Sequence, residues 1–186
     1  MMTNDKDIIR TMREDAEHGF RLLMQSYKEP LYWHIRRLVV SHDDAQDAAQ
    51  EAFIRIFRSF GQYSEENSLR AWLFRIATNE ALRLIERRRE DSMPIEKVFS
   101  DQRSECGVAI DIQADSYINY SDMEAVRLQK AILSLPPKQQ LAFNLRYYDE
   151  MDYDEIAQIA DTTAASVKAS YHVAKEKIIK FMTSND

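Results

Sequence analysis

The sequence predicts an all-α protein, with two small helical domains joined by a flexible acidic linker. Only three glycines and four prolines occur in 186 residues, and no run rich in Val, Ile and Thr is bounded by turn residues, which argues against a β fold. Apolar residues instead recur at i, i+3 and i+4, the spacing of helices that bury one face. This periodicity fades between residues 91 and 121, so the predicted domains span residues 1–90 and 122–186.

Composition excludes several classes of function. A single cysteine, Cys106, cannot form an internal disulfide, and the four histidines show no metal-ligand spacing, so we expect neither a metal nor another cofactor. No signal-like segment follows the N-terminus, and no apolar run approaches the roughly 18 residues of a membrane span, which predicts a cytoplasmic protein without direct membrane insertion. No Ser/His/Asp order or phosphate-binding glycine loop is present, so we expect no enzyme and no small-molecule substrate.

The charge distribution bears on nucleic-acid binding. The formal net charge is −6, and the imbalance is greatest in residues 91–121, which hold two Lys or Arg against six Asp or Glu. Non-specific affinity for DNA comes from neutralising phosphates with basic side chains, so a chain this acidic should bind DNA weakly by itself. Any role on DNA is therefore expected to need a partner.

Residues 7–40 carry helical periodicity that breaks near Glu29 and Pro30. Proline fits the first turn of a helix, because that position needs no backbone N–H donor. We therefore predict two helices here, the second of which begins at Pro30.

The next segment begins with Ser41-His42-Asp43-Asp44, which has the Ser-x-x-acid form of a capping box and predicts the start of a helix. Alanines and larger apolar residues then recur on one face as far as Ile56. Such a helix has a polar opposite face, which is either simply solvated or a docking surface for another protein. The side chains predicted on that face are Asp44, Asp47, Gln50, Glu51, Arg55 and Arg58.

A polar loop at residues 61–67 leads into a long helix over Ser68–Arg89, with Ser68 as its N-cap. A loop before a basic helix can hold extruded bases, although most loops only connect. The helix is predicted to bury one stripe of apolar residues. They are Leu69, Trp72, Leu73, Ile76, Ala77 and Leu84.

The edge beside that stripe carries basic and amide side chains. Arginine pairs with phosphate, and amide side chains suit the edges of bases, so this edge is a candidate nucleic-acid reader. An amphipathic helix with a solvated end is the alternative. The edge residues are Arg75, Asn79, Arg83 and Glu86, followed by Arg87, Arg88 and Arg89 at the helix end.

The acidic segment at residues 91–121 is interpreted as a flexible linker. Its lone thiol, Cys106, is interpreted as incidental rather than as a redox switch, because its nearest basic neighbour in sequence is Arg103. Ser121 begins a second capping box, which predicts a helix that ends before Pro136. Another helix is predicted over Lys138–Tyr148.

The last informative segment, Tyr153–Lys175, has the pattern of a helix-turn-helix. A short helix, a turn at Asp161-Thr162-Thr163 and a longer helix follow one another. Asp161 stands where glycine is usual, and aspartate tolerates the left-handed conformation that such a turn needs. Two packed helices without a role on DNA are the alternative reading. The outward residues of the longer helix are predicted to be Ala165, Ser166, Ala169, His172 and Val173, rimmed by Lys168 and Lys175.

A resemblance to a known family covers nearly the whole chain. Five short fragments, in their order along the chain, resemble a bacterial sigma factor of the extracytoplasmic-function group. They are Asp47-x-x-Gln50-Glu51-x-Phe53, Trp72-Leu73-x-x-Ile76-Ala77-x-Asn79, Leu135-Pro136, Glu155-Ile156-Ala157 and Val167-Lys168. The resemblance implies that the first domain, region 2, binds the β′ clamp helices of core RNA polymerase and opens the minus-ten element of promoter DNA. It implies that the second, region 4, reads the minus-thirty-five element and touches the β flap.

The resemblance also assigns roles to individual residues. It implies that Asp47, Gln50, Glu51 and Arg55 belong to the polymerase-docking helix. The loop from Gln62 to Asn67 would receive a flipped non-template base, and Asn79 would lie on the minus-ten reading edge. From their place on or after the same helix edge, we expect Arg75, Arg83, Arg87 and Arg88 to contact the same DNA. For the minus-thirty-five element the resemblance implies only that the last helix reads it, and from the outward surface of that helix we expect the contacts to come from Ser166, Lys168, Ala169, His172 and Lys175. An anti-sigma factor is implied as a further partner.

Two departures from the family pattern matter. Arg83 and Glu86 stand where the family commonly has aspartate and then arginine, and Ser170 and Val173 stand where it often has arginines. The outward surface of the last helix favours methyl contacts, hydroxyl or imidazole hydrogen bonds and phosphate anchoring over bidentate reading of guanine.

We therefore expect a transcription initiation factor without catalysis of its own. The main alternative is a conventional helix-turn-helix regulator that binds DNA tightly without polymerase. A helical interaction protein that binds neither is a third.

Overall fold

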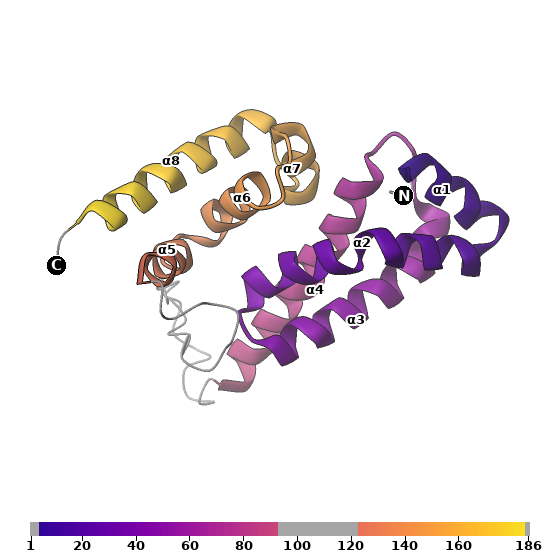
Figure 1. The fold of residues 1–186 in the computed structure, drawn as a ribbon, viewed down its shortest axis with the longest axis horizontal. Helices are drawn as coiled ribbons and strands as arrows, with labels where there is room; N and C mark the ends of the chain where they lie inside the picture. The colour runs from indigo at the N-terminus through magenta and orange to yellow at the C-terminus, as the bar shows by residue number, and fades with distance from the viewer. Residues whose placement is uncertain (1–3, 93–122, 185–186) are drawn as a thin grey trace. The chain divides into compact units, whose positions relative to one another are not determined.

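The computed structural model describes residues 4–92 and 123–184 (Figure 1). Within these ranges the chain forms eight α-helices and one short 3-10 helix, with no strand, which confirms the all-α prediction. Contacts divide the chain into two compact units, Met1–Ile85 and Glu86–Asp186. The predicted linker from residue 93 onward, with Cys106 and the cap at Ser121, lies outside the described residues.

The first unit contains α1 (Asp5–Glu14), α2 (Ala16–Val39), α3 (His42–Ser59), the 3-10 helix η1 (Phe60–Gln62) and α4 (Leu69–Ser92) as far as Ile85; the rest of α4, from Glu86, is assigned to the second unit. In Figure 1, α2 and α3 lie side by side, and α1 packs against α2. Helix α4 contacts both long helices, through Thr78 and His34 of α2 and through Glu80 and Arg55 of α3. Their facing sides bury large apolar residues from all three long helices. These include Leu23, Leu31, Ile35, Ile56, Leu73 and Phe74.

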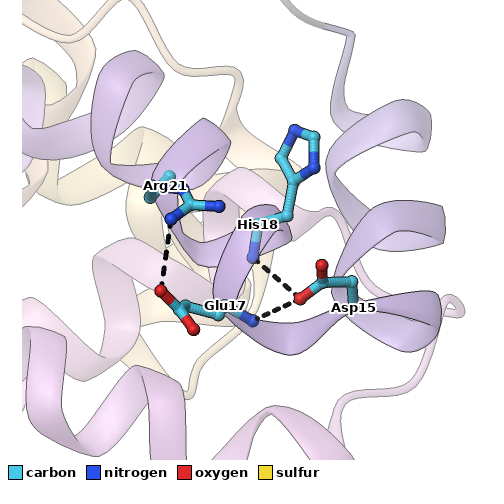
Figure 2. A network of polar contacts seen from close by, with 4 residues as sticks. All are labelled: Asp15, Glu17, His18 and Arg21. Carbon is cyan, nitrogen blue, oxygen red and sulfur yellow. Dashed lines mark hydrogen bonds and ion pairs between the residues drawn. The ribbon is translucent and has the colours of Figure 1, made fainter.

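The prediction that a helix begins at Pro30 is wrong. Pro30 lies inside α2, and the break comes earlier, at Asp15, whose extended backbone separates α1 from α2. Figure 2 shows the cause: the Asp15 carboxylate accepts hydrogen bonds of 3.1 Å from the backbone N–H groups of Glu17 and His18. Glu17 also pairs with Arg21 one turn later, at 3.2 Å. Buried residues on both sides of Pro30 keep α2 continuous although proline supplies no N–H.

Gly19 lets α1 approach α2 closely. A Cβ atom at this position would lie 2.3 Å from the backbone nitrogen of Met12 and 2.4 Å from its Cα. No side chain fits there without moving backbone, so the α1–α2 packing depends on glycine.

The predicted cap of α3 is confirmed, because Ser41 Oγ accepts from the Asp44 N–H at 3.4 Å. The prediction that Asp44 faces outward is wrong, since Asp44 is only 3% exposed. Asp44 lies one turn before Ala48 and two turns before Ala52, and both alanines are buried. Its helical position therefore places it on the packed face.

The second unit contains α5 (Met123–Leu133), α6 (Pro137–Tyr147), α7 (Tyr153–Ala160) and α8 (Ala164–Thr183). Helices α5, α6 and α8 share a small core, and α7 packs against α6 and α8. The core residues are Ala131, Ile132, Leu135, Phe143, Ala174 and Ile178.

The turn between α7 and α8 has the predicted conformation. Asp161 is left-handed, with φ 52° and ψ 53°, and its N–H bonds to the Ala157 carbonyl. Thr163 then caps α8 by accepting from the Ser166 N–H at 3.2 Å. These two local devices produce the sharp change of direction of a helix-turn-helix.

Candidate functional site

The outer surface of α3 combines polar and apolar side chains. Asp47, Gln50, Glu51 and Arg55 are all exposed, as the sequence predicted for a solvent-facing set. The buried alanines Ala45, Ala48, Ala49 and Ala52 face the other way and bring α3 close to its neighbours. This geometry leaves the polar residues available to a partner.

Two large apolar residues on the same surface escaped the sequence prediction. Ile54 and Phe57 are 37% and 46% exposed, and they follow Gln50 at helical spacing of four and seven residues. Phe57 is held edge-on against Phe20 of α2, with ring centroids 5.1 Å apart. Because both residues lie off the buried stripe, their apolar character was the signal that could have identified them as a binding surface.

The loop after α3 is anchored by Tyr63. Its ring is buried against Phe60 and Trp72, with centroids 5.7 Å and 5.2 Å away. Its hydroxyl donates a 2.7 Å hydrogen bond to the backbone carbonyl of Asn67. Tyr63 thus closes the loop across four residues, while Gln62 and the Asn67 side chain remain at the surface.

The environment of Tyr63 favours its neutral form. Burial raises the pKa of the Tyr63 phenol above 10.0, and the charges of Glu65 and Asp5 add to this, while Arg13 opposes it. Arg13 of α1 also forms a 2.5 Å ion pair with Glu65 in the loop. Both members of that pair are more than half exposed, so it orients the loop more than it stabilises the fold.

The outer edge of α4 carries the predicted basic residues. Arg75, Asn79 and Arg83 are exposed, and so are Arg87 and Arg88 in the last part of the helix. The buried face is broader than predicted, because Ala71, Phe74, Thr78 and Ala81 are also covered. Trp72, Ile76 and Leu84 are only half-buried.

A buried hydrogen-bond chain fixes the rotation of α4 about its axis. Thr78 Oγ1 lies 2.8 Å from the Phe74 carbonyl, to which it donates, and 2.8 Å from His34 Nε2 of α2. The Thr78 hydroxyl has one hydrogen, and the Phe74 carbonyl accepts it. The hydroxyl oxygen therefore accepts the hydrogen bond from His34, whose proton lies on Nε2. This contact, together with the His34–Phe74 ring packing at 5.0 Å, turns the Arg75–Asn79 edge outward.

Glu80 is a third candidate residue, after Ile54 and Phe57, that the sequence did not predict. It is 4% exposed and lies on α4 beside two half-exposed arginines. Its Oε1 is 2.6 Å from Arg55 Nε and 3.1 Å from Arg83 Nη1. The i, i+3 spacing to Arg83 was visible in the sequence, whereas the contact with Arg55 depends on how α3 packs against α4.

The second unit presents an outward surface on α8. All five predicted residues, Ser166, Lys168, Ala169, His172 and Lys175, are exposed. Val167, Ala174 and Ile178 are buried on the opposite side. Helix α8 is thus oriented as the second helix of a helix-turn-helix must be to enter a groove of DNA.

The chemistry of these surfaces is that of binding. Arginine and lysine neutralise phosphate, amide groups contact base edges, and the exposed apolar residues of α3 suit a protein partner. Among the described residues no group of His, Cys, Asp and Glu could hold a metal ion. The same part of the chain contains no helix that is both long and apolar enough to cross a membrane.

Comparison with known families matches both units. The family model described as Sigma-70 region 2 matches residues 23–90, and the one described as Sigma-70, region 4 matches residues 125–178. The ECF RNA polymerase sigma factor SigW of Bacillus subtilis is 27% identical over 181 residues, which cover 94% of this chain and 95% of SigW. The ECF RNA polymerase sigma-E factor of Escherichia coli K12 is 27% identical over 176 residues, which cover 94% of this chain and 92% of the sigma-E factor.

Solved structures share the fold. CnrH in complex with the cytosolic domain of CnrY superposes with a TM-score of 0.72 at 15% identity, over 98% of this chain and 99% of CnrH. The sigma factor RpoE of Bartonella quintana, in complex with the anti-sigma factor NepR, superposes with a TM-score of 0.65 at 21% identity, over 90% of this chain and 98% of RpoE.

Proposed function

The chain belongs to the sigma-70 family, in its extracytoplasmic-function group, and from this premise we propose how its surfaces bind core RNA polymerase and promoter DNA. It is a transcription initiation factor. Residues 1–90 serve as region 2, residues 91–121 as the linker and residues 122–186 as region 4.

The surface of α3 is proposed to dock on the β′ clamp helices of polymerase. Asp47, Gln50, Glu51 and Arg55 supply polar contacts, and Ile54 and Phe57 supply apolar area. Large apolar side chains that are buried on association contribute much of the affinity of protein interfaces. Charged neighbours set the orientation of docking.

Promoter opening is proposed to occur at the loop and the edge of α4. Unstacking a base costs a few kcal/mol, so opening needs a site that traps the extruded base. The loop anchored by Tyr63 supplies that site, with Gln62 and Asn67 at its surface. The neighbouring edge of α4 lines the path of the minus-ten strand: Asn79 contacts base edges, and its arginines bind the phosphates. These arginines are Arg75, Arg83, Arg87 and Arg88.

Region 4 is proposed to read the minus-thirty-five element through α8, and to contact the β flap. Ala169 and the aliphatic part of the surface suit the methyl group of thymine, and Ser166 and His172 can hydrogen-bond to base edges. Lys168 and Lys175 anchor phosphates. With a net charge of −6, the chain should bind DNA weakly until polymerase brings both regions to the promoter, where linkage raises their joint affinity.

One observation carries the residue assignments. Every residue assigned to the three surfaces is exposed, whereas their helical neighbours on the opposite faces form the cores. The family match indicates the partners, and this exposure supports the proposed contacts.

The direct test uses purified core polymerase, the chain and a promoter library. We expect a stable complex with core enzyme and run-off transcripts that require both proteins. Core enzyme alone and the chain alone serve as controls. Tight sequence-specific binding by the chain alone, without a complex with core enzyme, would instead support the conventional helix-turn-helix regulator.

An anti-sigma factor is a further proposed partner. RpoE of Bartonella quintana is seen bound to the anti-sigma factor NepR, and a regulator of this kind would act here by covering the α3 surface. Co-purification of such a partner, followed by loss of core binding when it is added, is the expected result.

A further inference from the structure

A buried carboxylate connects two arginines that the proposed function assigns to different partners. Glu80 Oε1 is 2.6 Å from Arg55 Nε and 3.1 Å from Arg83 Nη1. The Glu80 side chain is 5% exposed, whereas the arginine side chains are 48% and 52% exposed. The anion is therefore covered by the protein, and both cations extend from it to the surface.

We infer that Glu80 is a positioning residue shared by the polymerase-docking surface and the promoter-binding edge. It holds Arg55 on α3 in the orientation that meets polymerase and Arg83 on α4 in the orientation that meets DNA. The inference rests on the proposed function, which assigns each arginine its partner.

The physical basis is preorganisation. An arginine side chain loses considerable rotamer freedom when it binds, and one that is already held loses less. Arg55 directs Nε toward Glu80, and its guanidinium carries four further N–H donors on the two Nη atoms. A charge-assisted hydrogen bond to a carboxylate shielded from water is stronger than an exposed one, so Glu80 can restrict both side chains.

The arrangement also gives a reason for one departure from the family pattern. Arg83 stands where the family commonly has aspartate, so this position of α4 carries a positive charge in place of a negative one. Glu80 supplies an acid one turn earlier, at the i, i+3 distance that reaches Arg83. The positive charge of Arg83 is thereby oriented without being removed from the surface.

The experiment uses the full chain with Glu80→Gln, which keeps the shape of the side chain and removes its charge. Glu90→Gln is the matched control, because Glu90 is exposed on the same helix. Binding to core polymerase and the rate of promoter opening at saturating factor are measured separately. Each is repeated in the Arg55→Ala and Arg83→Ala backgrounds.

We expect Glu80→Gln to weaken core binding and to slow promoter opening, each by about threefold or more, the size of a coupling between contacting residues. The binding defect should disappear in the Arg55→Ala background and the opening defect in the Arg83→Ala background. Glu80→Asp, which keeps the charge, should recover part of both activities. A general loss of structure would not show this background dependence, and thermal unfolding of each variant measures it directly.

Three results would overturn the inference while leaving the proposed function intact: additive effects in both backgrounds, unchanged activities in Glu80→Gln, or tighter binding to DNA by that variant. Tighter binding would mean that Glu80 competes with phosphate for Arg83. If the unmodified chain fails to bind core polymerase at all, it is the proposed function that fails.

Discussion

Arg55 and Glu80 form a 2.6 Å ion pair between α3 and α4, although they are 25 positions apart in the sequence. The pair joins a partly exposed arginine of the proposed docking surface to a carboxylate of the helix proposed to bind the promoter. We therefore propose that this contact between α3 and α4 serves function as well as packing.

Phe57→Ala should weaken binding to core polymerase by about tenfold or more, in the range of an interface residue whose truncation costs 1–2 kcal/mol. Phe57 is 46% exposed and packs against Phe20, so the free energy of unfolding should fall by less than for a fully buried residue. Ile56→Ala is the matched control, because Ile56 is fully buried in the same helix, and should destabilise the fold by about 2–5 kcal/mol. Fluorescence titration with core enzyme and chemical denaturation separate the two effects. Wild-type affinity in Phe57→Ala would remove Phe57 from the docking surface.

The stability of the first unit should fall at alkaline pH through Tyr63. The pKa of Tyr63 is raised above 10.0 in the folded state. The contribution of Tyr63 to the free energy of unfolding is therefore complete below pH 10. It decreases as the pH rises toward the folded pKa, because the unfolded chain loses the phenol proton at lower pH than the folded chain does. Tyr63→Phe should remove this part of the pH dependence. Thermal unfolding followed by circular dichroism from pH 8 to pH 11 measures it, and equal slopes in both proteins would contradict the prediction.

Lys168→Ala should weaken binding of the polymerase complex to all minus-thirty-five sequences about equally. Loss of one phosphate contact lowers the slope of log affinity against log salt by about 0.9. Lys177→Ala is the control, because Lys177 is also exposed but lies nine residues further along α8, on its opposite side. Binding measured at several salt concentrations distinguishes the two. A change of sequence preference in Lys168→Ala would indicate a base contact instead.

Gly19→Ala should destabilise the first unit by about 1–3 kcal/mol, the usual cost of overpacking. The added Cβ would meet the Met12 backbone at 2.3 Å, and neither helix can move without disturbing the α1–α2 packing. Gly61→Ala is the matched control, since a Cβ there meets nothing within 4 Å. Denaturant unfolding of both variants tests the difference, and equal midpoints would show that α1 adjusts freely.

The sequence by itself determined those features that depend on neighbours a few residues apart. Ser41 caps α3, Asp161 adopts the left-handed turn, and the predicted outward residues of α3 (except Asp44), α4 and α8 are exposed, because capping, turn chemistry and helical periodicity act within one or two turns of the chain. The order of short motifs also led to the family that the comparisons support.

Only the tertiary structure decided the features that depend on contacts between helices. Pro30 lies within α2 because packing on both sides of it outweighs the missing hydrogen bond, and Asp44 is buried because the packed face of α3, with Ala48 and Ala52, extends to its first turn. The anchoring of the loop by Tyr63 and the sharing of Glu80 by Arg55 and Arg83 arise where distant segments meet. Helical periodicity specifies which face a residue occupies, but which partner faces it is set by how the helices pack.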